Sequence, residues 1–359
     1  MKILFVTDLI PIVEEENCAK ALIPIIKELQ ANNEVDIVRP NFLPNSIIRG
    51  KKILKNGIYT CNNLNISNLN YFTPFWSKLT KIDVNQYDKI IAHMPSGILF
   101  VEQLLKQKLI HKPQITYAVH QSDIHVLTDF KYSIYFKNKL LNAFKNCDEV
   151  ACRAPHLKEK ILKLIPEIEN NITIKSSKIP KELFMPENEM IEKFDDISTL
   201  NFITAANFIK RKNIDLLIKA FSLHKDKAFT LKIIGSGKEE KKLKKLCNKL
   251  NLENKIIFIG KLPQEKVFDE MKKSQIFILP SINETLGLVY LEASACGCLC
   301  IGTKNTGIDG IFQNNINSFF CDANVKGIAK VLEKTFSLTK EDFHNLLKNR
   351  SIADFKSTF

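Results

Sequence analysis

Short apolar, β-branched runs alternate with amphipathic segments along the first half of the sequence. Residues 3–7 and 35–38 are runs typical of strands, and residues 18–30 between them carry apolar side chains at helical spacing. The same alternation predicts strands at 3–7, 35–38, 89–92, 115–119 and 149–151, and helices at 18–30, 98–108, 132–144 and 157–164. Strands separated by helices in this way predict a parallel sheet that is covered on both faces.

An acidic stretch that is poor in aliphatic residues, 186–199, precedes a second series of the same kind. This series predicts strands at 202–205, 229–234, 256–259, 276–279 and 299–301, a helix from Ile214, and helices that end at Leu250, Lys272 and Ala295. We therefore predict an N-terminal domain at 1–185, a linker at 186–199 and a C-terminal domain at 200–359. The expected fold is α/β, with two doubly wound Rossmann-like domains facing a central cleft at the carboxyl ends of their sheets.

The composition is that of a globular protein of about two domains, with 359 residues of which 45% are hydrophobic and 25% charged. It excludes disordered and collagen-like chains. We expect a cytoplasmic protein, because the sequence has no apolar run of about 18 residues and its opening is too short for the core of a signal peptide. The 9 cysteines are scattered over a long chain, so we expect reduced thiols.

The net charge of +13 is shared by both halves, without a basic tail. Such a surplus attracts phosphate-rich or membrane-surface partners, and it is also typical of a lysine-rich background composition. One segment mixes basic and apolar residues, and it would suit either peripheral contact with the inner face of the cell membrane or an ordinary solvated loop or helix. Its basic residues are Arg49, Lys51, Lys52 and Lys55, among Ile47, Ile48, Ile53 and Leu54.

A candidate anion site lies where the strand that ends at Leu279 is followed by a turn and a helix expected to start near Leu286. The unpaired amides and positive dipole end of a helix start favour an anion, and Gly287 lets a phosphate approach the backbone. Glu284 lies just before this helix, and Glu292 lies about 9 Å along its axis. Two such carboxylates could hold hydroxyls at opposite ends of a nucleotide sugar. Alternatively, Glu284 caps the helix and Glu292 pairs with a lysine.

The sequence contains four further clusters, and three of them follow predicted strands. Lys212 precedes the helix at Ile214 and is expected to face the cleft, whereas Lys210 and Arg211 are expected to be solvated. His120 ends a strand of the first half, where it either faces the cleft or is a buried or capping histidine. Two other clusters have simpler explanations: a tight turn at Gly235-Ser236-Gly237, and small buried hydrophobes at Cys296, Cys298 and Cys300 rather than metal ligands.

Together these residues resemble the donor-binding domain of the family 4 glycosyltransferases, which are retaining enzymes of the two-domain GT-B fold. The resemblance rests on Lys212 with 214–221, on 234–237, on 258–262, and on the run 280–297 in which Glu284 and Glu292 form an E-x7-E pair. The first half resembles the family more loosely, through 119–123 and 177–186.

The resemblance implies a role for each matched residue. Glu284 would contact the donor sugar, Lys212 would stabilise the leaving diphosphate, and His120 would reach in from the acceptor-binding domain at 1–185. Glu292 would bind the ribose. The other donor-binding candidates are Thr285, Leu286, Gly287 and Leu288 at the diphosphate, Gly260, Lys261 and Leu262 at the base, and Asn207, Gly235 and Gly237. The resemblance implies no metal, no cofactor besides the donor and no protein nucleophile, because a departing phosphate oxygen acts as the base.

The sequence departs from the family pattern at several points. The family commonly has an arginine where Asn207 stands, so one phosphate cation is either missing or supplied by Lys210 or Arg211. The loop at 11–17 has no glycine and three acids, so we expect it to turn away from the diphosphate or to serve the acceptor. Thr285 and Leu286 replace the usual Gly-Phe. The family's last crossover helix would begin near the end of the sequence, so either that helix or the sequence is cut short.

We predict a retaining glycosyltransferase that moves a sugar from a nucleotide diphosphate sugar, expected to be UDP-linked, to a hydroxyl of a bacterial-type surface glycan or lipid-linked oligosaccharide. One alternative is a nucleotide-sugar epimerase of GT-B architecture, which would need more acid–base residues around the donor. Another is a basic nucleic-acid binder, but neither half has the interleaved basic and aromatic stripe that single-strand binders use.

Overall fold

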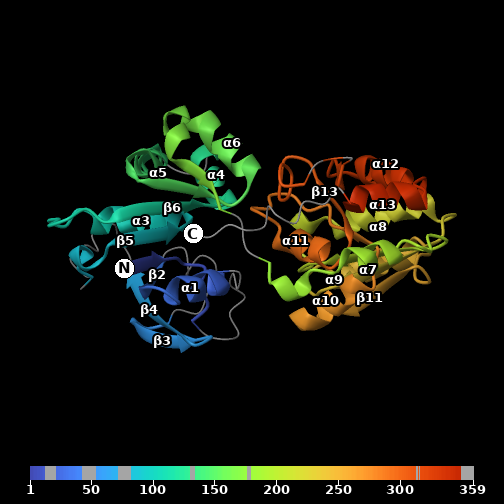
Figure 1. Cartoon of the computed structure of the whole chain (residues 1–359), viewed down its shortest axis with the longest axis horizontal. Coiled ribbons are helices and arrows are strands. Elements are labelled where there is room, and N and C mark those ends of the chain that lie inside the picture. The colour runs from blue at the N-terminus through green and yellow to red at the C-terminus, as the bar shows by residue number, and fades with distance from the viewer. Residues whose placement is uncertain are drawn as a thin grey trace. The chain divides into compact units, whose positions relative to one another are not determined.

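The computed structural model describes residues 1–12, 22–42, 54–71, 82–129, 134–175, 179–312, 314 and 316–348. Contacts divide the chain into two units, which are described one at a time (Figure 1). The first unit contains the described residues of Met1–Arg153 and Leu157–Ser177, and the second contains those of Ala154–His156 and Lys178–Lys356.

A mixed sheet forms the centre of the first unit. Its strands, within the described residues, are β1 (Lys2–Val6), β2 (Glu34–Phe42), β3 (Gly57–Cys61), β4 (Leu64–Tyr71), β5 (Lys89–His93), β6 (Gln114–Val119), β7 (Glu149–Cys152) and β8 (Ile172–Ile174). They lie in the order β3-β4-β2-β1-β5-β6-β7-β8, and all pairs are parallel except the β3–β4 hairpin. The helices of this half are α1 (Leu22–Gln30), α3 (Met94–Leu104), α4 (Gln121–Thr128), α5 (Ile134–Asn146) and α6 (Pro155–Leu164).

The central strand β1 shows why the apolar runs become strands. Phe5 lies opposite Ile37 of β2 and Ile91 of β5, and all three side chains are buried. A parallel strand in this position has helices or loops on both faces, so both faces must be apolar. The unbroken apolar run of β1 meets that requirement.

The second unit has a fully parallel sheet. Its described strands are β9 (Leu200–Ala205), β10 (Phe229–Ile234), β11 (Ile256–Gly260), β12 (Ile276–Ile278), β13 (Leu299–Thr303) and β14 (Ser318–Cys321). They lie in the order β11-β10-β9-β12-β13-β14, which is the doubly wound order. The direction of winding reverses between β9 and β12. Ligands of such sheets bind at the carboxyl ends of the strands beside the reversal, so this point locates the candidate site.

The helices of the second unit are α7 (Glu187–Glu192), α8 (Ile214–Phe221), α9 (Glu240–Lys249), α10 (Gln264–Lys272), α11 (Leu288–Ala295), α12 (Val325–Phe336) and α13 (Lys340–Lys348). In Figure 1, α8 and α12 lie side by side, and the two helices are in contact. The amphipathic α8 buries Leu217 and Phe221, and the Phe221 ring meets the Phe202 ring of β9 edge-on at 5.0 Å between centroids. This packing fixes the turn that leads from β9 into α8.

Within the described residues, each strand and helix expected from the periodicity is present, with shifts of up to four residues at the ends. Residues 18–21 and 132–133 of two predicted helices lie outside that part. Among the described elements, the pattern missed β3, β4, β8, β14, α4, α12 and α13, and it predicted a linker where α7 lies. Strand β4 has the polar residues Ser67 and Asn68 side by side, which breaks its alternation of apolar and polar positions, and α4 follows β6 after a single residue, so neither gives a clear apolar period.

The stretch 186–199 is not a linker, which corrects the prediction. It contains α7, and its residues Met190 and Phe194 are buried in the core of the second unit. The Phe194 ring packs on Phe343 of α13 at 4.8 Å between centroids. The stretch is acidic because the outer face of this short helical segment is exposed.

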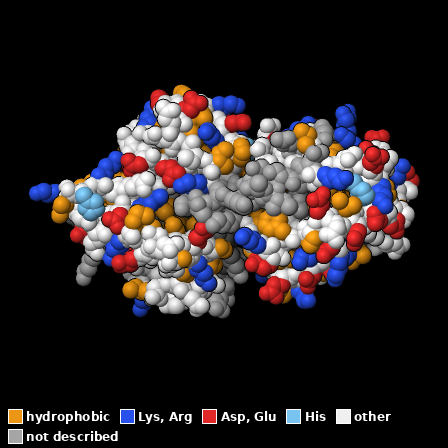
Figure 2. Space-filling model, viewed as in Figure 1, with side chains coloured by type: hydrophobic (Ala, Val, Ile, Leu, Met, Phe, Trp, Pro, Cys, Tyr) orange, Lys and Arg blue, Asp and Glu red, His pale blue; other side chains and the backbone are white. Residues whose placement is uncertain are grey.

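Several predicted features lie outside the described residues. They are Ile47, Ile48, Arg49, Lys51, Lys52 and Ile53 of the basic-apolar segment, residues 13–17 of the acidic loop, and Ser177. Among the helices that are described, none has both the length and the apolar character needed to cross a bilayer. On the face drawn in Figure 2, basic and acidic side chains are interspersed, so the positive surplus is not gathered there in one patch.

Candidate functional site

The loops that follow β10, β9 and β12 are joined by hydrogen bonds in the order of their strands. The Phe208 N–H after β9 donates to the Ser236 carbonyl after β10 at 2.8 Å. Across the reversal, the Ile282 N–H after β12 donates to the Arg211 carbonyl at 2.9 Å. The carboxyl edge of the sheet is therefore built as one connected surface at the place where a ligand is expected.

Glu284 lies at the middle of this edge, between β12 and α11, and is only 8% exposed. Its Oε1 accepts three hydrogen bonds, from Lys212 Nζ at 2.5 Å, Arg211 Nη1 at 2.8 Å and Ser281 Oγ at 2.5 Å. Both cations come from the turn after β9, so the contact spans the reversal. The structure thus brings together Glu284 and Lys212, two of the three predicted catalytic residues.

The charges of this cluster oppose the effect of burial. Burial by itself raises the pKa of Glu284, but the positive charges of Lys212 and Arg211 outweigh it and lower the pKa below its ordinary value. Burial also lowers the pKa of Lys212, an effect that Glu284 partly offsets. Glu284 is therefore ionised at neutral pH, with two cations on one of its oxygens.

A second loop holds the backbone of Glu284. The Glu284 N–H donates to Thr306 Oγ1 at 2.8 Å, and that hydroxyl donates to the Glu284 carbonyl at 3.2 Å. The Gly307 N–H also donates to this carbonyl, at 3.3 Å. Thr306 follows β13, so a loop beyond the neighbouring strand fixes the acid from the other side.

Helix α11 begins at Leu288, two residues later than predicted. Gly287 is its N-cap and has φ 72° and ψ 57°, a left-handed conformation that favours glycine. Of the four residues predicted at the diphosphate, Leu286 has its side chain in the hydrophobic core, and Thr285, Gly287 and Leu288 are half-buried. The predicted contacts of this stretch are therefore limited to backbone amides and the Thr285 side chain.

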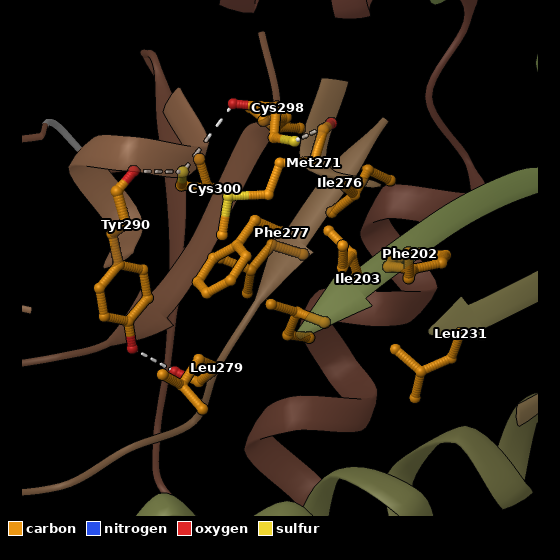
Figure 3. Packing of buried hydrophobic residues seen from close by; sticks show 14 of the residues in the cluster. Phe202, Ile203, Leu231, Met271, Ile276, Phe277, Leu279, Tyr290, Cys298 and Cys300 are labelled. Atoms are coloured by element: carbon orange, nitrogen blue, oxygen red, sulfur yellow. Dashed lines mark hydrogen bonds between the residues drawn. The ribbon is translucent and has the colours of Figure 1, made fainter. Parts of the chain in front are cut away.

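Tyr290 fastens the start of α11 to the end of β12. Its hydroxyl donates to the Leu279 carbonyl, as Figure 3 shows, and its ring meets Phe277 edge-on at 5.3 Å between centroids. A Cβ on Gly287 would lie 2.7 Å from this ring. The glycine is therefore required both by its backbone conformation and by the tyrosine that packs against it.

Glu292 lies on α11 and is not part of the Glu284 cluster. Its Oε1 accepts a hydrogen bond from Gln264 Nε2 of α10 at 3.1 Å, so its partner is an amide rather than a lysine. Burial raises the pKa of Glu292. The surroundings of the two carboxylates of the E-x7-E pair thus shift their pKa values in opposite directions, down for Glu284 and up for Glu292.

Gly235 and Gly237 lie where neighbouring backbone atoms leave no room for a side chain. A Cβ on Gly235 would lie 1.9 Å from the Ala206 carbonyl oxygen, and one on Gly237 would lie 2.7 Å from the Phe208 carbonyl oxygen. Gly260 differs, because it has φ 89° and a Cβ there would meet nothing within 4 Å. Of the remaining donor-binding candidates, Asn207 and Lys261 are exposed and Leu262 is half-buried against the core.

His120 belongs to the first unit, at the end of β6 and the start of α4. One of its ring nitrogens, Nε2, lies 3.0 Å from Nδ1 of His93, which ends the neighbouring strand β5. Burial and the nearby charge of Arg153 lower the pKa of His120 to about 3, and burial lowers that of His93 as well. The two rings are therefore neutral and share one hydrogen bond. The His120 N–H donates to Asp123 Oδ2 at 2.7 Å.

Sequence reasoning missed several members of these clusters. Arg211 was expected to be solvated, and it instead bonds Glu284 while its side chain stays 43% exposed. Ser281, Thr306 and His93 were not singled out. His93 could have been found, because it ends a strand directly before a helix in the same way as His120.

The cysteines Cys296, Cys298 and Cys300 are buried. The Cys298 thiol donates a hydrogen bond to the Met271 carbonyl at 3.1 Å, and the Cys300 thiol donates one to the Tyr290 carbonyl at 3.3 Å (Figure 3). This is the burial expected of small hydrophobic residues.

Comparisons with known proteins bear on the family and on the fold. Residues 192–350 match the model of the family described as glycosyl transferases group 1. The chain is 26% identical over 252 residues to the N-acetyl-alpha-D-glucosaminyl L-malate synthase of Bacillus anthracis, covering 69% of this chain and 64% of the relative. It is 28% identical over 247 residues to an uncharacterized glycosyltransferase of Methanocaldococcus jannaschii, covering 68% and 63%. The chain thus spans just under two thirds of the length of these curated relatives.

The fold also matches solved structures. The Anabaena protein Alr3699/HepE, solved in complex with UDP, superposes with a TM-score of 0.71 at 14% identity, covering 97% of this chain and 93% of that one. With the two Rossmann-like units described above, the chain has the GT-B fold, as predicted. The cleft between its halves and the membership of family 4 stay predictions.

Proposed function

We propose that this protein is a retaining glycosyltransferase that transfers a sugar from a UDP-sugar to a hydroxyl group of a glycan or lipid-linked acceptor. The observation that carries the proposal is the cluster of Lys212, Arg211 and Glu284 at the reversal point of the second sheet. It combines fixed cations, a buried carboxylate and the start of a helix. Each of the three suits one part of a nucleotide diphosphate sugar.

The cations suit the leaving group. When the bond between the sugar and the diphosphate breaks, negative charge grows on the phosphate oxygens, and cations that are already in place lower the barrier. Lys212 is held by the fold with its side chain 12% exposed, so little reorganisation is needed. The amides at the start of α11 add the positive end of a helix dipole nearby.

The carboxylates suit the two ends of the donor. Glu284 is ionised and can accept hydrogen bonds from sugar hydroxyls, as the resemblance to family 4 implies. Glu292 lies farther along α11, and with Gln264 beside it the pair offers both an acceptor and a donor to the ribose hydroxyls. His120, at the start of α4, is the third residue to which we assign a catalytic role, and the proposal invokes no metal or further cofactor.

The choice of donor and acceptor class rests on the relatives. The name of the B. anthracis relative specifies an α-linked N-acetylglucosaminyl group on malate, and the Anabaena structure holds UDP. These names support a UDP-sugar donor and a hydroxyl acceptor. A surface glycan or a lipid-linked oligosaccharide is the acceptor class proposed, with the protein in the cytoplasm and in peripheral contact with the membrane.

The test is transfer from a panel of UDP-sugars to lipid-linked and free glycan acceptors, read as acceptor-dependent release of UDP. Glu284→Gln and Lys212→Ala should each lower the rate about 100-fold or more, because each removes a preorganised charge. Lys219→Ala is the matched control, since this lysine of α8 pairs with Asp215 on the exposed helix surface. NMR of the product gives the anomeric configuration.

Full transfer by both site variants would refute the proposal. Inverted product would refute retention alone. Conversion of the UDP-sugar to its epimer without any acceptor would instead identify an epimerase.

A further inference from the structure

Two adjacent residues, Arg211 and Lys212, place their cationic groups on the same carboxylate oxygen. Arg211 Nη1 lies 2.8 Å and Lys212 Nζ 2.5 Å from Oε1 of Glu284. One negative charge therefore faces two positive charges in a partly buried place. The cluster keeps a surplus of positive charge, which an anionic group of a ligand would neutralise.

The backbone holds Arg211 in this position independently of its charge. Residues Lys210–Lys212 form one turn of 3-10 helix that ends at Asn213, whose φ of 53° is left-handed. The Arg211 carbonyl accepts a hydrogen bond from the Ile282 N–H at 2.9 Å. A backbone hydrogen bond of Arg211 itself thus joins the turn after β9 to the loop after β12.

The two cations differ in how accessible they are. The side chain of Lys212 is 12% exposed and that of Arg211 is 43% exposed. Lys212 is therefore the buried cation of the pair, and Arg211 is the one that solvent or a ligand can reach. A guanidinium has five N–H groups in a planar fork, so Arg211 can keep its bond to Glu284 and still bind a phosphate.

We propose that Arg211 binds the β-phosphate of the donor, as a second diphosphate cation beside Lys212. This inference rests on the proposed function. Glu284 is assigned to the donor sugar, and the phosphate attached to that sugar is the β-phosphate, so a cation in contact with Glu284 lies next to it. Asn207, which has a neutral side chain, cannot supply this charge.

The experiment compares the affinities of UDP and UMP for the full-length protein, measured by calorimetry, in the wild type and in Arg211→Ala, Arg211→Lys and Lys210→Ala. UMP lacks the β-phosphate. Arg211→Ala should weaken UDP binding about tenfold or more, as expected for the loss of a hydrogen bond between charged groups, and should leave UMP binding within about twofold. Arg211→Lys should restore part of the UDP affinity, because it keeps the charge but not the fork.

Lys210→Ala is the matched control, because Lys210 is an exposed cation in the same turn. It should leave the affinities of both nucleotides unchanged. The inference would be overturned if Arg211→Ala bound UDP as the wild type does, or if UDP and UMP lost affinity equally, because an equal loss indicates a distorted loop. A larger UDP loss in Lys210→Ala than in Arg211→Ala would also overturn it. If the wild type bound neither UDP nor any UDP-sugar, the proposed function itself would fail.

Discussion

Replacing Glu284 by glutamine should destabilise the protein as well as inactivate it. Glutamine has nearly the same shape and can still accept the hydrogen bond from Ser281, so the change removes little more than the negative charge. Lys212 then remains in place, 12% exposed, without its buried counter-ion. The cost of an uncompensated buried charge is the main term in the prediction.

The magnitude follows from the burial of the pair. Breaking a buried ion pair by removing one partner costs about 3–5 kcal/mol. Because Arg211 is 43% exposed and gains solvation when released, the lower end applies, about 3 kcal/mol. For a domain of roughly 150–250 residues, this corresponds to a fall in Tm of about 6–12 °C.

The assay is scanning calorimetry, with the transition of the second unit followed separately, since a chain of two units need not unfold in one step. Asp215→Asn is the matched control, because it removes a carboxylate from an exposed pair with Lys219 and should cost less than about 0.5 kcal/mol. The double variant Glu284→Gln with Lys212→Met should recover most of the loss, since it removes the orphaned charge as well.

The pH dependence gives a second check. The fold lowers the pKa of Glu284, so the unfolded chain binds its proton more readily than the native state does. The stabilisation from this group is therefore present above the unfolded pKa, near 4.5, and is lost as pH falls through the native pKa. The difference between wild type and Glu284→Gln should be full at neutral pH and shrink in acid. Equal Tm values for Glu284→Gln and Asp215→Asn at neutral pH would refute the reasoning.

Two further substitutions test other parts of the structure. Gly287→Ala should lower the free energy of unfolding, measured by urea denaturation, more than Gly260→Ala does. Both substitutions incur about 1–2 kcal/mol of left-handed backbone strain. Only Gly287→Ala also pushes a Cβ against a buried ring, that of Tyr290. Under the proposed role of His120, His93→Leu should lower turnover about tenfold by releasing the ring of His120, with partial rescue by His93→Asn. His111, whose ring contacts the Tyr87 carbonyl, is the control, and His111→Ala should not change turnover. Equal stability losses in the glycine pair, or unchanged turnover in His93→Leu, would contradict these expectations.

The sequence predicted the elements well wherever burial imposes a clear period. β1 and α8 are examples, because one is buried on both faces and the other on one stripe. The stretch 186–199 misled the prediction, since composition reports the exposed side chains of a segment, while Met190 and Phe194 anchor it in the core. Two buried residues in an acidic stretch are too few to give a periodic signal.

Side-chain direction within the site could not be predicted to the same extent. The spacing identified Glu284 and Lys212, but Arg211 was placed in solvent because three consecutive basic residues cannot all face one way on a regular element. They lie on a single 3-10 turn that ends at the left-handed Asn213, and this turn is fixed by a hydrogen bond from a loop elsewhere in the sequence. Only the tertiary structure determines which neighbours of Lys212 share its direction.

The contact between Lys212 and Glu284 also depends on the buried strands β9 and β12 that precede their loops. Lys212 and Glu284 are 72 positions apart, and they meet because β9 and β12 lie side by side with Ile276 opposite Phe202 and Phe277 opposite Ile203. A slip of one residue would move one loop about 3.3 Å along the strand and turn each side chain of that strand to the other face. Catalytic groups tolerate displacements of only about 0.5 Å, so the four apolar side chains that set this register determine the geometry of the site as directly as the charged residues do.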